Sequence, residues 1–172
     1  LIPCLNEEKT LQFCIKKASK FLNSQKFKFE ILVVDNGSTD KTVSIAKKNG
    51  ARVVVENIKG YGSALYTGIK KARGKYIIMG DADGGYDFGN LKGFIDKFDE
   101  GYDLVSGWKK IRNDSLGKVF ASKIFNLVTR LRTGVKIHDF NCGLKAYKKA
   151  VIKSIEIYGG RHRFIPALAG QK

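Results

Sequence analysis

Two aspartates separated by a single residue, Asp81 and Asp83, are the clearest candidates for chemistry in this sequence. They follow the apolar segment 75–80, which is typical of a strand, and residues two apart at a strand end can point the same way. Two unpaired carboxylates this close repel each other, so one of them would take up a proton. A divalent cation removes that repulsion, and oxygen ligands suit Mg²⁺ or Mn²⁺. The pair therefore predicts a metal site, with a simple turn as the alternative.

Asp35 is a second candidate, because it ends the apolar segment 29–35 directly before the turn 36–40. A carboxylate at the end of a buried strand can accept hydrogen bonds from a base N–H or a ribose hydroxyl. The alternative is an ordinary strand–turn–helix junction in which Thr39 or Asp40 only caps the helix. The glycine-containing segment 57–64 opens a helix without matching G-x-G-x-x-G, so it does not indicate a dinucleotide site. Its Lys59 could still approach a diphosphate.

The elements that must position these residues alternate between short apolar segments and amphipathic ones, which is typical of an α/β domain. Asn6 is a suitable N-cap for the first helix, with two glutamates in the first turn. Polar residues gather after the strands, where open α/β sheets bind ligands. The predicted helices span residues 7–22, 62–72, 90–98 and 116–132. The predicted strands span residues 29–35, 52–56, 75–80, 103–107 and 143–147.

The 172 residues suffice for one domain, and their net charge of +16 attracts polyanions: nucleic acid, anionic lipid or phosphorylated substrates. The cysteines are scattered and form no zinc-type cluster, which fits a reducing compartment. No apolar run reaches the roughly 18 residues that a membrane span needs, and no signal peptide is present. Because the chain starts at Leu1, we expect it to be part of a longer protein.

In combination, these segments resemble the family-2 glycosyltransferases with the GT-A fold. Residues 3–8 (Pro-Cys-Leu-Asn-Glu-Glu) are similar to the opening P-x-x-N-E segment of that family, and residues 34–40 to its V-D-[DN]-G-S-x-D turn, with Asn36 where many relatives have a second Asp. Residues 59–64 (Lys-Gly-x-Gly-x-Ala) and 80–83 (Gly-Asp-Ala-Asp) complete the series in the expected order.

The resemblance continues beyond these motifs. Residues 139–147 resemble the D-x-x-[SC]-G-[FL]-[KR]-x-[YF] stretch of dolichyl-phosphate mannose synthase-like enzymes, and residues 161–166 fit bacterial and archaeal polyprenyl-phosphate sugar transferases. The resemblance implies a Rossmann-like, three-layer α/β/α sandwich with a mostly parallel sheet. Residues 1–172 would form a single catalytic domain that lacks the first β-strand, expected before Leu1, and a C-terminal, membrane-associated region. The expected location is the cytoplasmic face of a membrane.

The resemblance also implies roles for individual residues. Asp139 and Asp83 are the expected catalytic residues, and Asp87 or water is expected as a third metal ligand, because glycines stand where related synthases carry Leu-Gln after the acidic pair. The residues expected to bind the nucleotide sugar are Pro3, Leu5, Asn6, Glu7, Asp35, Gly37, Ser38, Lys59, Gly62, Asp81 and Ala82. The expected metal ligands are Asp81, Asp83 and Asp87. The residues expected to bind the acceptor phosphate are Lys109, Arg112, Ser122, Lys123, Arg161 and Arg163.

The implied reaction is the inverting transfer of a hexose from a nucleotide sugar, of the UDP-glucose or GDP-mannose type, to a polyprenyl or dolichyl phosphate, with Mg²⁺ or Mn²⁺ as cofactor. A phosphate acceptor is mostly deprotonated at neutral pH, because its second pKa is about 6, so it needs cations rather than a base. The alternative acceptor is a glycan hydroxyl, for which Asp139 would be the general base.

A basic domain that binds nucleotide or nucleic acid without catalysis is the distant alternative. No RNA-binding signature supports it, so no nucleic-acid partner is expected. The charge predicts contact with an anionic membrane, and the oligomeric state stays open.

Overall fold

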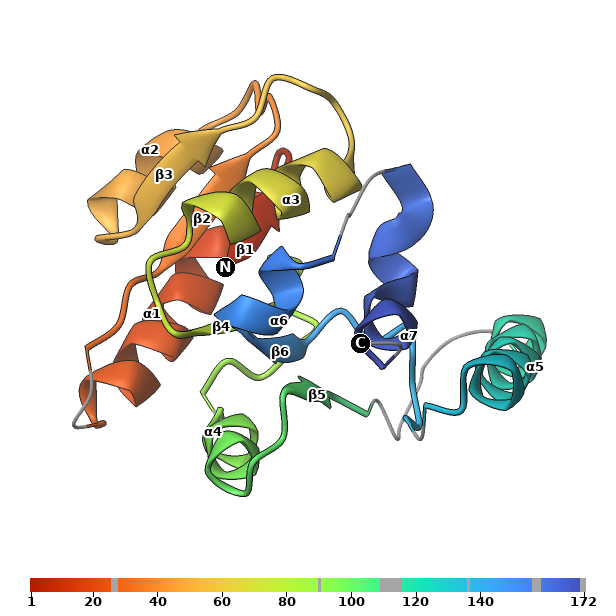
Figure 1. The fold of residues 1–172 in the computed structure, drawn as a ribbon. Helices are drawn as coiled ribbons and strands as arrows, with labels where there is room; N and C mark the ends of the chain where they lie inside the picture. The colour runs from red at the N-terminus through yellow and green to blue at the C-terminus, as the bar shows by residue number, and fades with distance from the viewer. Residues whose placement is uncertain (26–27, 90, 109–115, 136, 156–158, 171–172) are drawn as a thin grey trace.

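The computed structural model describes the chain except residues 26–27, 90, 109–115, 136, 156–158 and 171–172, and except the side chains of residues 116, 118–119 and 159–161 (Figure 1). The strands are β1 (Ile2–Cys4), β2 (Leu32–Asp35), β3 (Arg52–Val55), β4 (Tyr76–Met79), β5 (Leu104–Ser106) and β6 (Lys145–Lys148). The helices are α1 (Leu11–Asn23), α2 (Thr42–Lys48), α3 (Tyr61–Lys71), α4 (Lys92–Asp99), α5 (Leu116–Thr133), α6 (Lys149–Lys153) and α7 (Ile165–Ala169), with the 3₁₀ helix η1 (Gly159–Phe164).

The strands form two three-stranded sheets that Leu1 connects. Strands β1, β2 and β3 are parallel, whereas β6 lies between β4 and β5 and is antiparallel to both. The Leu1 nitrogen donates to the Ile78 carbonyl at 2.8 Å, and the Leu1 carbonyl accepts from the Gly80 N–H at 3.2 Å, so β1 runs parallel to β4. Across the molecule the order is β3-β2-β1-β4-β6-β5, and β6 is the exception among otherwise parallel strands.

Side chains that alternate along the strands build a core on each face of this surface. Val33 packs with α1 in one core, and its neighbour Val34 packs with α3 in the other. The first core also takes residues of α2, and the second takes residues of α6 and α7. Helices therefore cover both faces, which confirms the predicted three-layer α/β/α arrangement.

Residues 2–4 form β1 and are buried against β2, while the expected strand before Leu1 stays a prediction. One prediction about this region is wrong. The first helix was expected to begin after an Asn6 cap, but α1 begins at Leu11. Asn6 has a φ of 58°, and a turn follows it in which the N–H of Leu11 donates to the Glu7 carbonyl at 2.9 Å.

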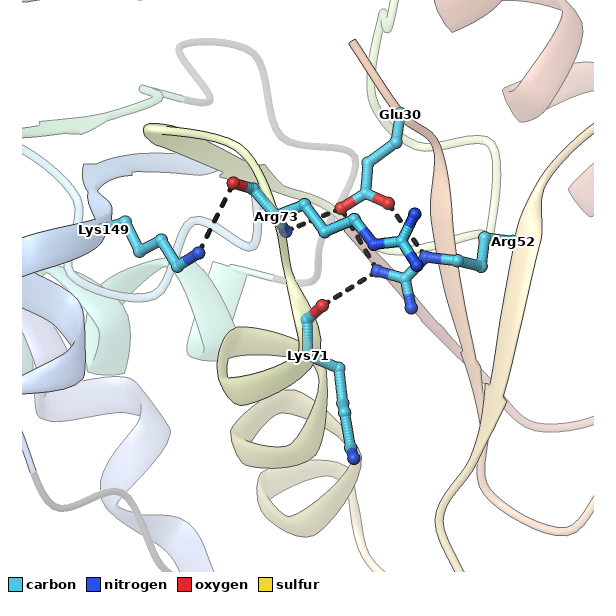
Figure 2. A network of polar contacts seen from close by, with 5 residues as sticks. All are labelled: Glu30, Arg52, Lys71, Arg73 and Lys149. Atoms are coloured by element: carbon cyan, nitrogen blue, oxygen red, sulfur yellow. Dashed lines mark hydrogen bonds and ion pairs between the residues drawn. The ribbon is translucent and has the colours of Figure 1, made fainter.

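A polar network around Glu30 connects several segments at the edge of the sheets where β2 and β3 begin (Figure 2). The Glu30 carboxylate accepts two hydrogen bonds from the Arg52 guanidinium, at 2.9 and 3.2 Å, and one from the Arg73 backbone N–H at 2.7 Å. Arg52 also donates to the Lys71 carbonyl at 2.8 Å, and Lys149 donates to the Arg73 carbonyl at 3.4 Å. One carboxylate thus joins the start of β2 to β3 and to the loop after α3.

We expect Glu30→Gln to destabilise the fold by roughly 1.5–3 kcal/mol at pH 7, the range for hydrogen bonds to charged groups. Burial alone would raise the pKa of Glu30, but the bonds from Arg52 and Arg73 outweigh it and lower that pKa. This stabilisation is therefore present above the pKa of the unfolded chain and is lost as the pH falls through the lower folded-state pKa. Urea unfolding at several pH values measures both effects.

Glu100→Gln is the matched control for this change, because Glu100 forms a surface pair with Lys97 and its side chain is 51% exposed. Such pairs contribute little to stability. Equal losses in the two variants at pH 7, or a gap between Glu30→Gln and the unaltered protein that persists in acid, would contradict the role assigned to the network.

Candidate active site

A cavity of about 870 Å³ opens at the carboxyl ends of β1, β2 and β4. Its wall combines the loops after these strands with the start of α3, segment 140–145 and η1. Among the residues expected to bind the nucleotide sugar, the metal or the acceptor, those that line it are Pro3, Leu5, Asn6, Glu7, Gly37, Lys59, Asp81, Ala82, Asp83 and Arg163. The structure thus brings together residues spread over most of the chain.

Hydrogen bonds connect the loop after β1 to the loop after β2. The Asn6 side chain accepts the Thr39 N–H at 2.8 Å, while the Asn6 N–H donates to the Ser38 hydroxyl at 2.9 Å. The next N–H, of Glu7, donates to the Thr42 hydroxyl at 2.8 Å. These bonds hold Asn6 and Glu7 at the cavity wall, and Ser38 supports that wall without lining it.

Asp35 has a structural role in the turn. It is 4% exposed, and its carboxylate accepts the N–H groups of Gly37 at 3.2 Å and Ser38 at 3.3 Å. It is absent from the cavity lining, and so is the buried Gly62 of α3. Gly37, at a φ of 92°, does reach the wall, and the predicted contacts of Asp35 and Gly62 with a nucleotide stay predictions.

The contacts of Asn36 account for the amide at a position where many relatives have a second Asp. Its amide donates to the carbonyls of Glu56 and Ile58, both at 2.9 Å, and its side-chain oxygen accepts the Gly60 N–H at 2.7 Å. A carboxylate cannot donate to two carbonyls, so an aspartate here would release this loop. The amide thereby fixes the segment that carries Lys59 to the cavity.

The acidic pair lies on the cavity wall as expected. Asp81 accepts a hydrogen bond from the Tyr61 hydroxyl at 2.7 Å, and Asp83 accepts the Gly85 N–H at 2.8 Å. Ala82 between them is buried. Two carboxylates joined by substrate phosphates and water form a donor set that suits Mg²⁺ or Mn²⁺.

Asp87 does not join this pair. It forms an ion pair with Lys17 at 3.4 Å and accepts the Gly89 N–H at 3.0 Å. Within the described part of the chain, no three His, Cys, Asp or Glu side chains are grouped closely enough to hold a metal. The structure therefore places Asp87 beside α1, and the role of Asp87 or water as a third metal ligand stays a prediction.

Segment 139–145 carries two buried charges of opposite sign. Asp139 is 1% exposed, accepts the Asn141 N–H at 3.1 Å and is absent from the cavity lining. Lys145 is 3% exposed, lines the cavity and donates to the Cys142 carbonyl. Burial lowers the pKa of Lys145, and the nearby carboxylates of Asp139 and Asp81 oppose that shift.

Lys145 is a candidate functional residue that the sequence interpretation assigned no role. The available signal was a lysine at the start of the apolar segment of β6, a position where a charge is seldom buried. The register of β6, opposite Met79 of β4 and Ser106 of β5, places it between the acidic pair and the end of β5. A fixed cation there can attract a phosphate group.

The predicted acceptor residues are dispersed. Arg163 lines the cavity beside His162, whereas Lys109, Arg112 and the Arg161 side chain lie outside the described structure. Ser122 and Lys123 lie on α5, away from the cavity lining. The structure therefore does not bring the last two to the acidic pair.

Helix α5 instead has an exposed apolar surface and lies apart from the sheets (Figure 1). A hollow of about 650 Å³ runs along it, with Phe164 as a further wall. The exposed apolar residues of α5 are Phe120, Ile124, Leu127, Val128 and Leu131. None of the helices that the structure describes is both long and apolar enough to cross a bilayer.

Comparison with known proteins gives a consistent result. Two curated relatives match nearly the whole chain: a dodecaprenyl-phosphate galacturonate synthase of Rhizobium johnstonii, 34% identical over 97% of this chain, and an undecaprenyl-phosphate 4-deoxy-4-formamido-L-arabinose transferase of Pseudomonas paraeruginosa, 31% identical over 98%. The match covers 52% of each relative, so the chain spans about half their length.

A solved structure and a family profile complete the comparison. The glucosyl-3-phosphoglycerate synthase of Mycobacterium tuberculosis, in complex with Mn²⁺ and UDP-glucose, superimposes with a TM-score of 0.75 over 95% of this chain and 61% of that protein. At 23% identity this likeness shows the fold alone, and it confirms the predicted GT-A fold. The profile of glycosyl transferase family 2 matches residues 1–156. The chain therefore belongs to glycosyl transferase family 2.

Proposed function

We propose that this chain carries the catalytic domain of a glycosyltransferase that moves a sugar from a nucleoside diphosphate to a polyprenyl phosphate. The observation that carries the proposal is one cavity that combines the acidic pair Asp81 and Asp83 with the cations Lys59, Lys145 and Arg163. Carboxylates for a metal and cations for phosphates are the two requirements of such a substrate pair. The names of both curated relatives specify polyprenyl phosphates.

The donor fits the side of the cavity formed by the loops after β1 and β2. Asn6, Glu7 and Gly37 would contact the nucleoside, and Lys59 would contact the diphosphate. Asp81 and Asp83 would hold a divalent cation, which when bound neutralises charge on the departing diphosphate. The donor sugar would be a hexose, with UDP-glucose and GDP-mannose types as the first to test.

The cavity wall favours a phosphate over a sugar hydroxyl as the acceptor. A hydroxyl needs a general base within hydrogen-bond reach, and Asp139, the residue predicted for that task, is 1% exposed and lies outside the cavity lining. A phosphate oxygen is already deprotonated at neutral pH. It attacks the anomeric carbon as the bond to the diphosphate breaks, with inversion, while Lys145 and Arg163 offset its charge.

Helix α5 and the net charge of +16 support docking on an anionic membrane, at its cytoplasmic face. The helix exposes apolar residues together with Lys123 and Arg132, a combination that suits the boundary between lipid headgroups and acyl chains. A lipid-linked acceptor would then reach the protein from that boundary.

A panel of donors and acceptors tests the proposal. The protein is incubated with UDP-glucose, UDP-N-acetylglucosamine, UDP-galacturonate or GDP-mannose, with and without Mn²⁺, and with either polyprenyl phosphate in vesicles or an oligosaccharide. We expect one donor to give a polyprenyl-phosphate sugar, only when the metal is present. Transfer to the oligosaccharide but to no lipid would establish the alternative acceptor, and transfer without metal would contradict the role of the acidic pair.

A further inference from the structure

The hydroxyl of Tyr61 donates a hydrogen bond to Asp81 at 2.7 Å, and no step of the proposed reaction uses it. Tyr61 is the first residue of α3 and follows Gly60, whose φ is 129°. Its ring packs against His162 with the ring centroids 4.8 Å apart and the planes at 54°. The hydroxyl is thus directed at Asp81 from α3, a different element from the loop after β4 that carries the acidic pair.

The second oxygen of Asp81 is confined as well. A β-carbon added at Gly143 would lie 2.2 Å from this oxygen, so the backbone of segment 139–145 lies directly against the carboxylate. That backbone is itself held, because the Gly143 N–H donates to the Tyr86 hydroxyl at 2.7 Å. Asp81 is therefore confined on both sides, whereas the exposed Asp83 accepts a hydrogen bond from Gly85 within its own turn.

Hydrogen bonds to a ligating carboxylate influence how well it binds a metal. Outer partners of metal ligands orient them, and their loss typically weakens metal affinity by about 10–100-fold. Tyr61 is such an outer partner, because its hydroxyl donates to the Asp81 carboxylate from the first turn of α3.

We propose that Tyr61 is a positioning residue for the divalent-cation site: through its hydroxyl it holds the Asp81 carboxylate in the orientation that binds the cation together with Asp83. The inference rests on the proposed function, since it assumes that the acidic pair binds a metal. It adds a residue from α3, outside the metal ligands, to the determinants of metal affinity.

Calorimetric titration with Mn²⁺ alone, without any sugar nucleotide, tests this inference on the unaltered protein, Tyr61→Phe and Tyr66→Phe. Tyr61→Phe keeps the ring that contacts His162 and removes only the hydroxyl, so we expect the fold to be retained, as thermal unfolding can verify. Tyr66 lies on the same helix, where the Lys70 ammonium lies 4.2 Å from its ring centroid, which makes Tyr66→Phe the matched control. We expect about 10–100-fold weaker Mn²⁺ binding in Tyr61→Phe and unchanged binding in Tyr66→Phe.

Equal or tighter Mn²⁺ binding by a folded Tyr61→Phe would overturn the inference and leave the proposed function intact. An equal loss in Tyr66→Phe would overturn it too, because a general effect on α3 would then explain the result. Absence of Mn²⁺ binding by the unaltered protein would contradict the metal site itself, and with it both proposals.

Discussion

Gly143→Ala is expected to lower the rate of sugar transfer by a factor of about 100, because misplacing a catalytic group by about 1 Å can cost this much. The new methyl group would lie 2.2 Å from an Asp81 oxygen and 2.9 Å from the Tyr86 hydroxyl, distances that real β-carbons do not tolerate. Either the carboxylate or segment 139–145 must then move. Initial rates with the donor found in the panel, together with Mn²⁺ affinity, measure the effect.

Gly93→Ala provides the control, since a β-carbon at this exposed position of α4 would meet no atom within 4 Å. Alanine is favoured over glycine within a helix by about 1 kcal/mol, so this variant should be at least as stable as the unaltered protein and equally active. Full activity in a folded Gly143→Ala protein would show that the contact between Gly143 and Asp81 is irrelevant to the reaction. The proposed arrangement of the acidic pair would then have to be abandoned.

Strands β2 to β6 and their order along the chain were predictable from the sequence, because short apolar segments that end in polar residues are typical of buried strands. The start of α1 was not. Asn6 carries the local signal of a helix cap, but its side chain bonds to Thr39 in a loop 33 positions further along the chain. A residue type alone cannot distinguish a local cap from such a long-range contact.

The cavity wall was predicted in outline through the family motifs, and the exceptions depend on where the fold places each side chain. Asp87 and Asp139 carry the chemistry expected of a ligand and a base, but the former turns toward Lys17 and the latter is buried. Lys145 was given no role, because its position depends on the antiparallel pairing of β6 with β4 and β5. Spacing along the chain gives no information about that pairing.

Asp83→Ala is expected to reduce metal-dependent transfer by roughly 100–1,000-fold, since a metal that polarises the reacting group supplies several kcal/mol. The variant should remain folded. Asp83 is exposed, and the hydrogen bond that it accepts from the Gly85 N–H lies within its own turn. Substitutions at such surface positions usually change stability by no more than about 0.5 kcal/mol. Rates across a Mn²⁺ series and urea unfolding separate the two effects.

Asp96→Ala removes a surface carboxylate that pairs with Lys92 at 2.8 Å on α4, so it controls for the general loss of negative charge. If both variants kept their activity and their response to Mn²⁺, the carboxylates at 81 and 83 would be parts of a turn and nothing more. The cations that surround the cavity would then have to bind the diphosphate without a metal, through Lys59, Lys145 and Arg163 alone. Because these three side chains lie on the same wall as the acidic pair, the measured Mn²⁺ dependence decides between the two arrangements.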